Sequence, residues 1–287
     1  MTTSRTVAVD GVRFHVLSAG PARKRRTTPV LLLHGVPATS ATWRPLMAEL
    51  AKDRQVLAPD LKGLGQSEAR EPYDIPTLVD ELAALALREL GGPFDVVGHD
   101  WGGSLALALA GTRPDLVRRV VDIAGPYRRV DPVRGSYMLF LALPVLPEVL
   151  GRVAGEQAVR QAIRAIWTSE GEPEAMEEYV AAYSSPERWR AMLSYYQSVV
   201  RPRVGRAVGA LVGREGVRIG MPPVKAERML VVWGSDDPPT PLHVGESVVR
   251  DLGPDATMLT VPGVGHFPHE EAPDVVLPAI AEFLRAP

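Results

Sequence analysis

The sequence predicts an α/β protein, in which a mostly parallel central sheet is flanked by helices and interrupted by a helical insertion. Short apolar runs alternate with helical patterns over the first 126 residues, vanish for almost 100 residues, and return near the C-terminus. A chain of 287 residues that is 46% hydrophobic fits one large domain. We therefore expect a core of residues 1–126 and 223–287 and a helical cap of residues 127–222.

The expected strands are short runs bounded by turn residues, most of them strongly apolar, and they cover residues 6–9, 12–18, 30–34, 55–58, 94–97, 119–123, 229–233 and 257–261. Helical spacing of apolar residues predicts core helices at 45–52, 76–90, 102–111 and 272–285. In the insertion it predicts helices at 136–143, 152–167, 174–183 and 188–200, and no strand. Strands that alternate with helices favour a parallel sheet.

Composition excludes several classes of protein. The 32 basic and 34 acidic residues leave no excess charge for a nucleic-acid partner, and no apolar run is long enough to span a membrane. The absence of cysteine excludes disulfides and thiolate metal sites, and no G-x-G-x-x-G motif follows a strand. The first residues lack the apolar region of a secretory signal. We expect a cytoplasmic monomer or homodimer without cofactor, metal, nucleic-acid partner or membrane contact.

The chemistry-bearing motif is the segment Gly98-His99-Asp100-Trp101-Gly102, which follows an apolar strand and precedes a helix of small residues. This is the spacing of a nucleophile elbow, in which glycines permit a sharp turn that presents the central side chain above the sheet. The central residue here is aspartate rather than serine. The competing interpretation, a simple helix N-cap, is disfavoured by the flanking glycines.

Three other strand ends supply matching groups in the order acid, then histidine, that this motif requires. One strand ends in Asp236 and Asp237, and the last strand leads into a glycine-rich loop that carries His266. An early strand ends in His34-Gly35-Val36-Pro37, where the Val36 N–H could pair with that of Trp101 to bind an oxyanion. Parallel sheets bring such strand ends to one edge.

The HGVP, PDLKGLGQS, GHDWGG, WGSDDP and GVGHF segments together resemble the α/β-hydrolase superfamily across most of the chain. GHDWGG with HGVP is most similar to the epoxide hydrolases, with the haloalkane dehalogenases close by. The resemblance implies that Asp100 is the nucleophile, that His266 is the base, and that Asp237 is favoured over Asp236 as its acid. It also implies that Trp101 and Val36 supply the oxyanion N–H groups.

His34, Gly35 and Pro37 form the rest of the oxyanion turn, and His34 is expected to be structural.

An aspartate nucleophile favours attack on saturated electrophilic carbon, because the resulting ester can be hydrolysed by activated water. Opening an epoxide also needs a proton donor, a role that suits tyrosine. Tyr196 and Tyr137 resemble the two cap tyrosines of epoxide hydrolases. The alternative to Tyr196 is the adjacent Tyr195, and the alternatives to Tyr137 are Tyr179 and Tyr183.

The expected activity is hydrolysis of a small apolar epoxide to a vicinal diol. The first alternative is a haloalkane dehalogenase that uses the same ester, with Trp167 or Trp189 as a halide donor. A second alternative is a homologue that binds a ligand without catalysis. The apolar residues of the expected cap, such as Met138 and Met192, suggest an apolar pocket, and the alternative is that they form the core of the cap.

Overall fold

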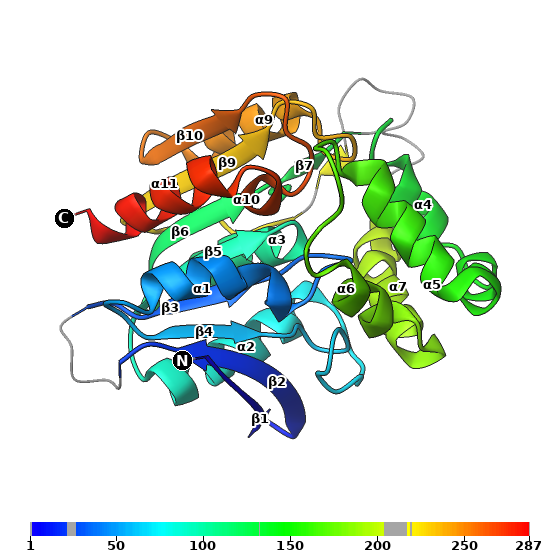
Figure 1. The fold of residues 1–287 in the computed structure, drawn as a ribbon, viewed down its shortest axis with the longest axis horizontal. Helices are drawn as coiled ribbons and strands as arrows, with labels where there is room; N and C mark the ends of the chain where they lie inside the picture. The colour runs from blue at the N-terminus through cyan, green and yellow to red at the C-terminus, as the bar shows by residue number, and fades with distance from the viewer. Residues whose placement is uncertain (1, 22–26, 132, 204–216, 219, 287) are drawn as a thin grey trace.

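The computed structural model describes residues 2–21, 27–131, 133–203, 217–218 and 220–286. Its centre is an eight-stranded sheet in the order β1-β2-β4-β3-β5-β6-β9-β10 (Figure 1). The strands are β1 (Thr3–Val9), β2 (Val12–Ala19), β3 (Val30–Leu33), β4 (Val56–Pro59), β5 (Phe94–His99), β6 (Val117–Ile123), β9 (Arg228–Gly234) and β10 (Ala256–Val261). All eight lie where the sequence predicts strands.

The six strands from β4 to β10 run parallel, and only the β1–β2 and β2–β4 pairs are antiparallel. The prediction of a mostly parallel sheet is therefore confirmed. After β3 the chain adds β4 on one side and then returns to add β5 on the other side. This reversal opens a crevice at the carboxyl ends of β3 and β5, where parallel sheets usually bind ligands.

Helices cover both faces of the sheet, as Figure 1 shows. Strand residues alternate between the two faces, so that Leu32 and Val232 pack with α1 (Arg44–Leu50) and α11 (Pro273–Arg285). The intervening residues face the other layer, which consists of α2 (Ile75–Leu90), α3 (Trp101–Thr112) and α9 (Leu242–Leu252). The central strands are thus buried on both sides, which explains their continuous apolar sequences.

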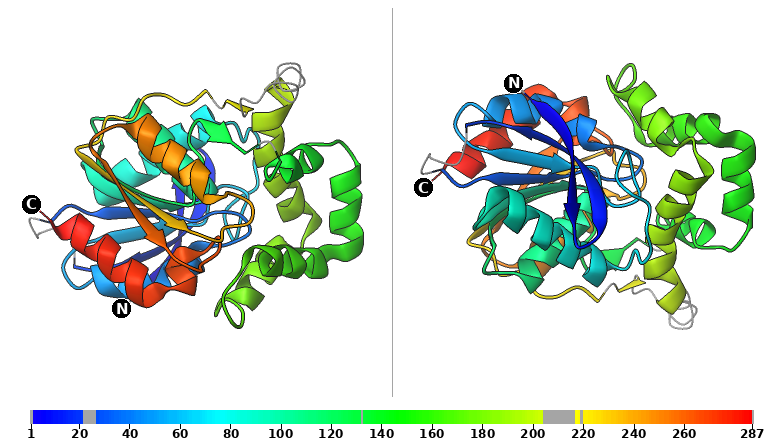
Figure 2. Two further views of the ribbon diagram at one scale, coloured as in Figure 1. Left: turned by 90° about the horizontal axis from the view of Figure 1, so that it is seen from above. Right: turned by 90° about the horizontal axis from the view of Figure 1, so that it is seen from below.

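Four helices of the insertion lie beside the carboxyl edge of the sheet (Figure 2). They are α4 (Ser136–Leu141), α5 (Leu146–Ile166), α6 (Met176–Tyr183) and α7 (Pro186–Val200), and a 3-10 turn at Arg201–Arg203 follows them. Tyrosine hydroxyls tie them to the core: Tyr183 donates to the Ala38 carbonyl at 2.8 Å, and Tyr195 donates to the Lys62 carbonyl at 2.7 Å. The exact cap limits, 127 and 222, stay a prediction.

The expectation of no strand in the insertion is wrong at its two ends. Strands β7 (Arg129–Val130) and β8 (Val217–Arg218) form a small antiparallel pair. Two residues are too few to create an alternating pattern, so the sequence carries no signal for them. The short elements η1 (Ser40–Trp43) and α10 (Pro268–Glu271), and the longer α9, were also absent from the predicted helices.

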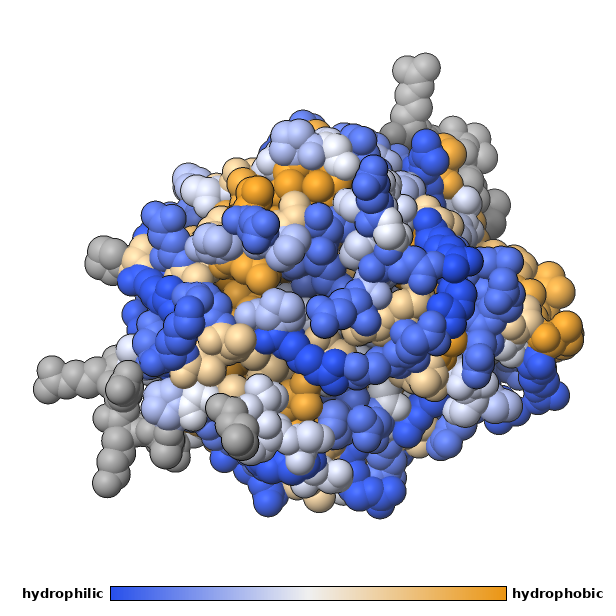
Figure 3. Space-filling model, in the orientation of Figure 1, coloured by the Kyte–Doolittle hydropathy of each residue, from blue (hydrophilic) through white to orange (hydrophobic). Residues whose placement is uncertain are grey.

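The surface in Figure 3 is mainly hydrophilic, with apolar side chains gathered at the edge where α5 begins. Exposed members of this group are Leu143, Val145, Leu146, Val149 and Val153. Within the described residues, no helix has the length and apolar character needed to cross a membrane.

The buried face of α11 allows a direct test of how this helix packs against the sheet. Ile280 is fully buried against the sheet, whereas Val275 on the same helix is half exposed. We expect Ile280→Ala to lower the free energy of unfolding by about 2–5 kcal/mol, because it leaves a cavity. Val275→Ala should change it by about 0.5 kcal/mol or less. Urea denaturation measures both, and equal losses would contradict this packing.

Candidate active site

The turn between β5 and α3 holds Asp100 in a strained conformation. Its φ of 51° and ψ of −117° lie outside the regions favoured by residues with a side chain. Flanking glycines make the turn possible, because a Cβ on Gly98 would lie 2.2 Å from the Gly102 carbonyl oxygen. A Cβ on Gly102 would lie 2.1 Å from the Leu33 carbonyl oxygen. The backbone therefore fixes where the Asp100 carboxylate points.

The Asp100 carboxylate is buried and faces two groups that the sequence singled out. Its Oδ1 accepts a hydrogen bond from the Val36 N–H at 2.9 Å, and its Oδ2 lies 3.4 Å from His266 Nε2. Burial raises the pKa of Asp100, but the hydrogen bond and charge of His266 outweigh it, so the pKa lies below its usual value. The Trp101 N–H stands beside it at the first position of α3, where a helix offers no internal acceptor.

His266 forms a second close contact, with Asp237. Its Nδ1 lies 2.8 Å from Asp237 Oδ2, and the Thr240 N–H and hydroxyl donate to the same carboxylate at 2.8 and 2.7 Å. Burial lowers the pKa of His266, but Asp237 and Asp100 outweigh it and raise that pKa to about 10. Asp236 instead accepts from the neighbouring Ser235 hydroxyl. The structure thus brings Asp237 rather than Asp236 to the histidine.

Two of the five candidate tyrosines share a cavity with Asp100. Tyr137 and Tyr196 line it together with Asp100 and Trp101, and their ring centroids are 6.1 Å apart. Burial, together with the Asp100 charge, raises the pKa of both phenols, so both remain protonated at neutral pH. The hydroxyls of Tyr179, Tyr183 and Tyr195 are bonded to Glu270, Ala38 and Lys62.

The cavity itself is small and largely apolar. Its volume is about 30 Å³, and the remaining lining residues are Ile75, Ser104, Pro126, Met138, Val199 and Met221. Met138 is thus a lining residue, as the sequence suggested. Most of these side chains are apolar, so they complement an apolar ligand.

The residues around Val36 hold the turn that presents its N–H. His34 is fully buried, and its Nε2 accepts from the Leu61 N–H at 2.9 Å while Nδ1 donates to the Gly35 carbonyl at 2.8 Å. Burial lowers the pKa of His34, which keeps it neutral and able to play both roles. Pro37 follows after a cis peptide bond. His34 thus supports the turn rather than facing Asp100.

Sequence reasoning did not identify Thr240 or Glu271, which hold Asp237 and the His266 loop respectively. Neither residue stands in a distinctive motif, so only the structure reveals them. His99, the residue before Asp100, donates from Nε2 to the His266 carbonyl at 2.8 Å. Burial lowers the pKa of His99 to about 3, so it is neutral.

The two tryptophans considered as halide donors differ in their contacts. The Trp189 indole N–H donates to the Pro147 carbonyl at 2.7 Å and is therefore occupied. The Trp167 indole N–H is buried and has no partner among the described residues, and its ring lies 5.9 Å from that of Phe267. No group of three or more potential metal ligands occurs in the described part of the chain.

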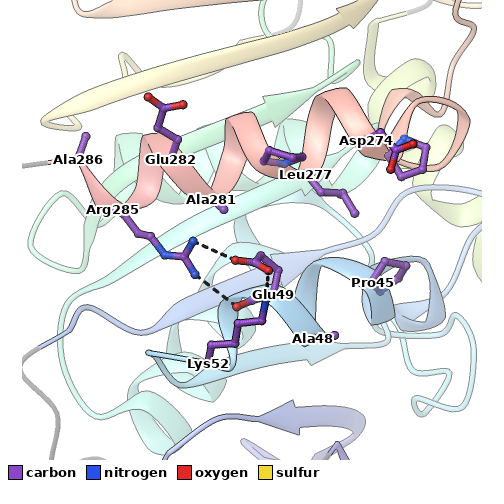
Figure 4. Close-up of a pocket in the computed structure, with 12 residues that line it drawn as sticks. Pro45, Ala48, Glu49, Lys52, Asp274, Leu277, Ala281, Glu282, Arg285 and Ala286 are labelled. Atoms are coloured by element: carbon purple, nitrogen blue, oxygen red, sulfur yellow. Dashed lines mark hydrogen bonds and ion pairs between the residues drawn. The ribbon is translucent and has the colours of Figure 1, made fainter.

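A second hollow, of about 1080 Å³, lies between α1 and α11 (Figure 4). It is open to solvent, and an ion pair between Arg285 and Glu49 crosses it at 3.0 Å. Its apolar lining includes Leu277 and Ala281. None of the predicted site residues lines this hollow, so the candidate active site is the cavity at Asp100.

Comparison with known proteins identifies the family to which the chain belongs. Residues 30–279 match the alpha/beta hydrolase family, so the chain belongs to that family, and hydrolase is the class of activity that this membership supports. The predicted fold is confirmed by a solved structure described as a novel epoxide hydrolase from metagenomes of hot environments. It has a TM-score of 0.83 and 24% identity and covers 100% of this chain and 99% of its own.

Two curated relatives align over almost the whole chain. Epoxide hydrolase 4 of Mus musculus is 25% identical over 96% of this chain and 77% of its own length. The magnesium-chelatase 30 kDa subunit of Rhodobacter capsulatus is 30% identical over 96% of this chain and 93% of its own. The chain is therefore similar to proteins named for different activities.

The His266 environment can be tested without a substrate. Because Asp237 raises the pKa of His266, Asp237→Asn should lower that pKa by about one to three units. NMR titration of the histidine ring protons measures it, with His266→Gln assigning the signal. The neighbouring Asp236→Asn is the control and should leave the titration in place. An unchanged pKa in Asp237→Asn would contradict the described contact.

Proposed function

We propose that the protein hydrolyses an epoxide to a vicinal diol through a covalent ester on Asp100, without a cofactor. The observation that supports this proposal most strongly is that two kinds of group, a histidine–aspartate pair and two tyrosines, surround one carboxylate. Asp100 faces the His266–Asp237 pair on one side and shares its cavity with Tyr137 and Tyr196. The likeness to epoxide hydrolase 4 adds support.

In the first step, Asp100 attacks an epoxide carbon and the carbon–oxygen bond of the ring breaks. Oδ2 is the better candidate for attack, because Oδ1 already accepts the Val36 N–H. The ring oxygen leaves as an alkoxide and takes a proton from Tyr196 or Tyr137. A phenol held in its protonated form by burial suits this donation.

Ester formation then changes the charge around His266. The resting site pairs the Asp100 carboxylate with a protonated His266, consistent with its raised pKa. Esterification removes the Asp100 charge, so the pKa of His266 falls. His266 loses its proton and the tyrosinate regains one, which leaves a neutral imidazole and a neutral phenol. The histidine is thus converted into a base once the ester exists.

In the second step, neutral His266 takes a proton from water, and the resulting hydroxide attacks Cγ of Asp100. The oxyanion forms on Oδ1, where the N–H groups of Val36 and Trp101 can stabilise it. The tetrahedral intermediate then collapses: the bond between Cγ and the diol oxygen breaks, and that oxygen takes the proton of the newly added hydroxyl, which releases the diol. The products are the Asp100 carboxylate and a protonated His266, so the cycle closes with all atoms and charges balanced.

Haloalkane dehalogenation is the second candidate function. The buried Trp167 indole N–H, which has no partner among the described residues, is the donor available for it, but Trp167 does not line the cavity that holds Asp100. A halide is a weak base that leaves without a proton, so it needs only N–H donors. Two phenols beside the nucleophile have no role in that reaction, which makes the epoxide the better substrate. Non-catalytic ligand binding is a further candidate function, and tight binding of a ligand without turnover would support it.

The ester can be trapped by removing the base. In His266→Gln, the Asp100 ester should form and persist, because no group activates water. Intact mass spectrometry after exposure to mixed apolar epoxides and alkyl halides reads the outcome. Addition of a whole epoxide supports the proposal, and addition of an alkyl group without its halogen supports the dehalogenase. No adduct, together with an inactive wild type, would contradict both enzymatic functions.

The tyrosines distinguish the two substrates further. Tyr196→Phe and Tyr137→Phe together should slow ester formation from an epoxide by about a hundredfold or more, because the proton donors are lost. Ester formation from an alkyl halide should change little. Tyr195→Phe is the control, since its hydroxyl bonds to Lys62 instead. Stopped-flow rates measure each, and an equal loss in the control would argue against the assigned roles.

The side chains that line the cavity also indicate the class of substrate. The substrate is a small apolar epoxide, because the cavity is mostly apolar. The cytoplasmic location, the monomeric or homodimeric state and the lack of a nucleic-acid partner stay predictions from the sequence.

A further inference from the structure

The loop that carries His266 is attached to the helical insertion through one carboxylate. Glu271, at the end of α10, accepts hydrogen bonds from the N–H groups on both sides of the histidine: Gly265 to Oε2 at 3.2 Å and Phe267 to Oε1 at 2.9 Å. Its Oε2 also accepts from the N–H and hydroxyl of Thr168 and of Ser169, at 3.0–3.1 Å. One side chain thus makes six hydrogen bonds, which join the neighbouring His266 loop to a segment about 100 residues earlier in the chain.

The backbone of His266 itself is held at both ends. Its N–H donates at 3.1 Å to the carbonyl of Ile166, the last residue of α5. Its carbonyl accepts from His99 at 2.8 Å. A Cβ on Gly265 would lie 2.9 Å from that Ile166 oxygen and 2.8 Å from the Thr168 hydroxyl. The end of α5 therefore packs directly against the histidine loop.

We infer that Glu271 is a positioning residue for His266. Glu271 holds this base in place only while residues 166–169 are packed against the core. The inference rests on the proposed function, in which His266 activates water in the second step. A shift of the loop would misalign His266 with the ester carbonyl. Displacements of about 1 Å can slow a reaction on the order of a hundredfold. Asp100, by contrast, is fixed by its own turn and does not depend on Glu271.

The neighbouring Glu270 offers a matched control. It is also a carboxylate between the insertion and the core, since it accepts from Tyr179 of α6 at 2.8 Å and from Thr42. Its side chain accepts no hydrogen bond from the His266 loop in the described structure. Replacing Glu270 therefore weakens the contact between insertion and core without releasing the histidine.

The kinetic test separates the two chemical steps. Glu271→Ala should form the ester within about threefold of the wild-type rate and hydrolyse it about a hundredfold more slowly, so that the ester accumulates. Glu271→Gln, which keeps one acceptor oxygen, should show a smaller defect. Glu270→Gln should leave both steps within about threefold. Single-turnover quench with mass detection measures them. Unchanged ester hydrolysis in Glu271→Ala, or an equal defect in Glu270→Gln, would overturn the inference.

Amide hydrogen exchange supplies a test that needs no substrate. Glu271→Ala should increase exchange in residues 263–268 and 166–169, with Glu271→Gln as the milder variant if the alanine variant does not fold. Glu270→Gln should not increase exchange in residues 263–268. Unchanged exchange there in folded Glu271 variants would overturn the inference by itself. Failure of the proposed function has a different signature: wild type without turnover and His266→Gln without an adduct, whatever the exchange result.

Discussion

The strained turn at Asp100 is the constraint on which the rest of the site depends. A residue with a side chain at φ 51° is costly, and the close approaches at Gly98 and Gly102 hold it in that conformation. Because the turn lies at the carboxyl end of β5, a strand that pairs with β3 and β6 and is buried along its whole length, its position is fixed by the centre of the sheet. The Val36 N–H and His266 then approach a carboxylate whose place is set by this turn.

Charge is the second organising feature. His266 lies between two buried carboxylates, one on each ring nitrogen, and this arrangement raises its pKa to about 10. In the proposed cycle the histidine is a cation while Asp100 is free and a base while Asp100 is esterified. The same pair of contacts thus gives His266 two protonation states in that cycle, and formation and hydrolysis of the ester change one into the other.

The insertion adds two kinds of group to this centre. Helices α4 and α7 bring Tyr137 and Tyr196 to the cavity, while the segment after α5 holds the loop of His266 through Glu271. Substrate contact and base alignment both depend on where these helices sit. In the proposed enzyme, the position of the insertion would therefore affect ester formation through the tyrosines and ester hydrolysis through His266.

The sequence predicted all eight strands of the sheet because most of them are short, strongly apolar runs bounded by turn residues. It also predicted the meeting of Asp100, His266 and Val36, since the elbow and strand ends have fixed places in a parallel sheet. It could not choose between Asp236 and Asp237 from spacing alone, because that choice depends on side-chain direction after the strand. Thr240 and Glu271 escaped prediction for the same reason. The two-residue strands β7 and β8 carry too little pattern to predict.

Isotope labelling tests the central claim, the ester on Asp100, most directly. A single turnover with enzyme in excess over an apolar epoxide would be run in water enriched in oxygen-18. If water attacks the Asp100 carbonyl, the label should enter the Asp100 carboxylate and be absent from the first diol formed, as peptide and product mass spectrometry would show. Label in the diol and none in Asp100 would mean that water opens the ring directly, and would contradict the account.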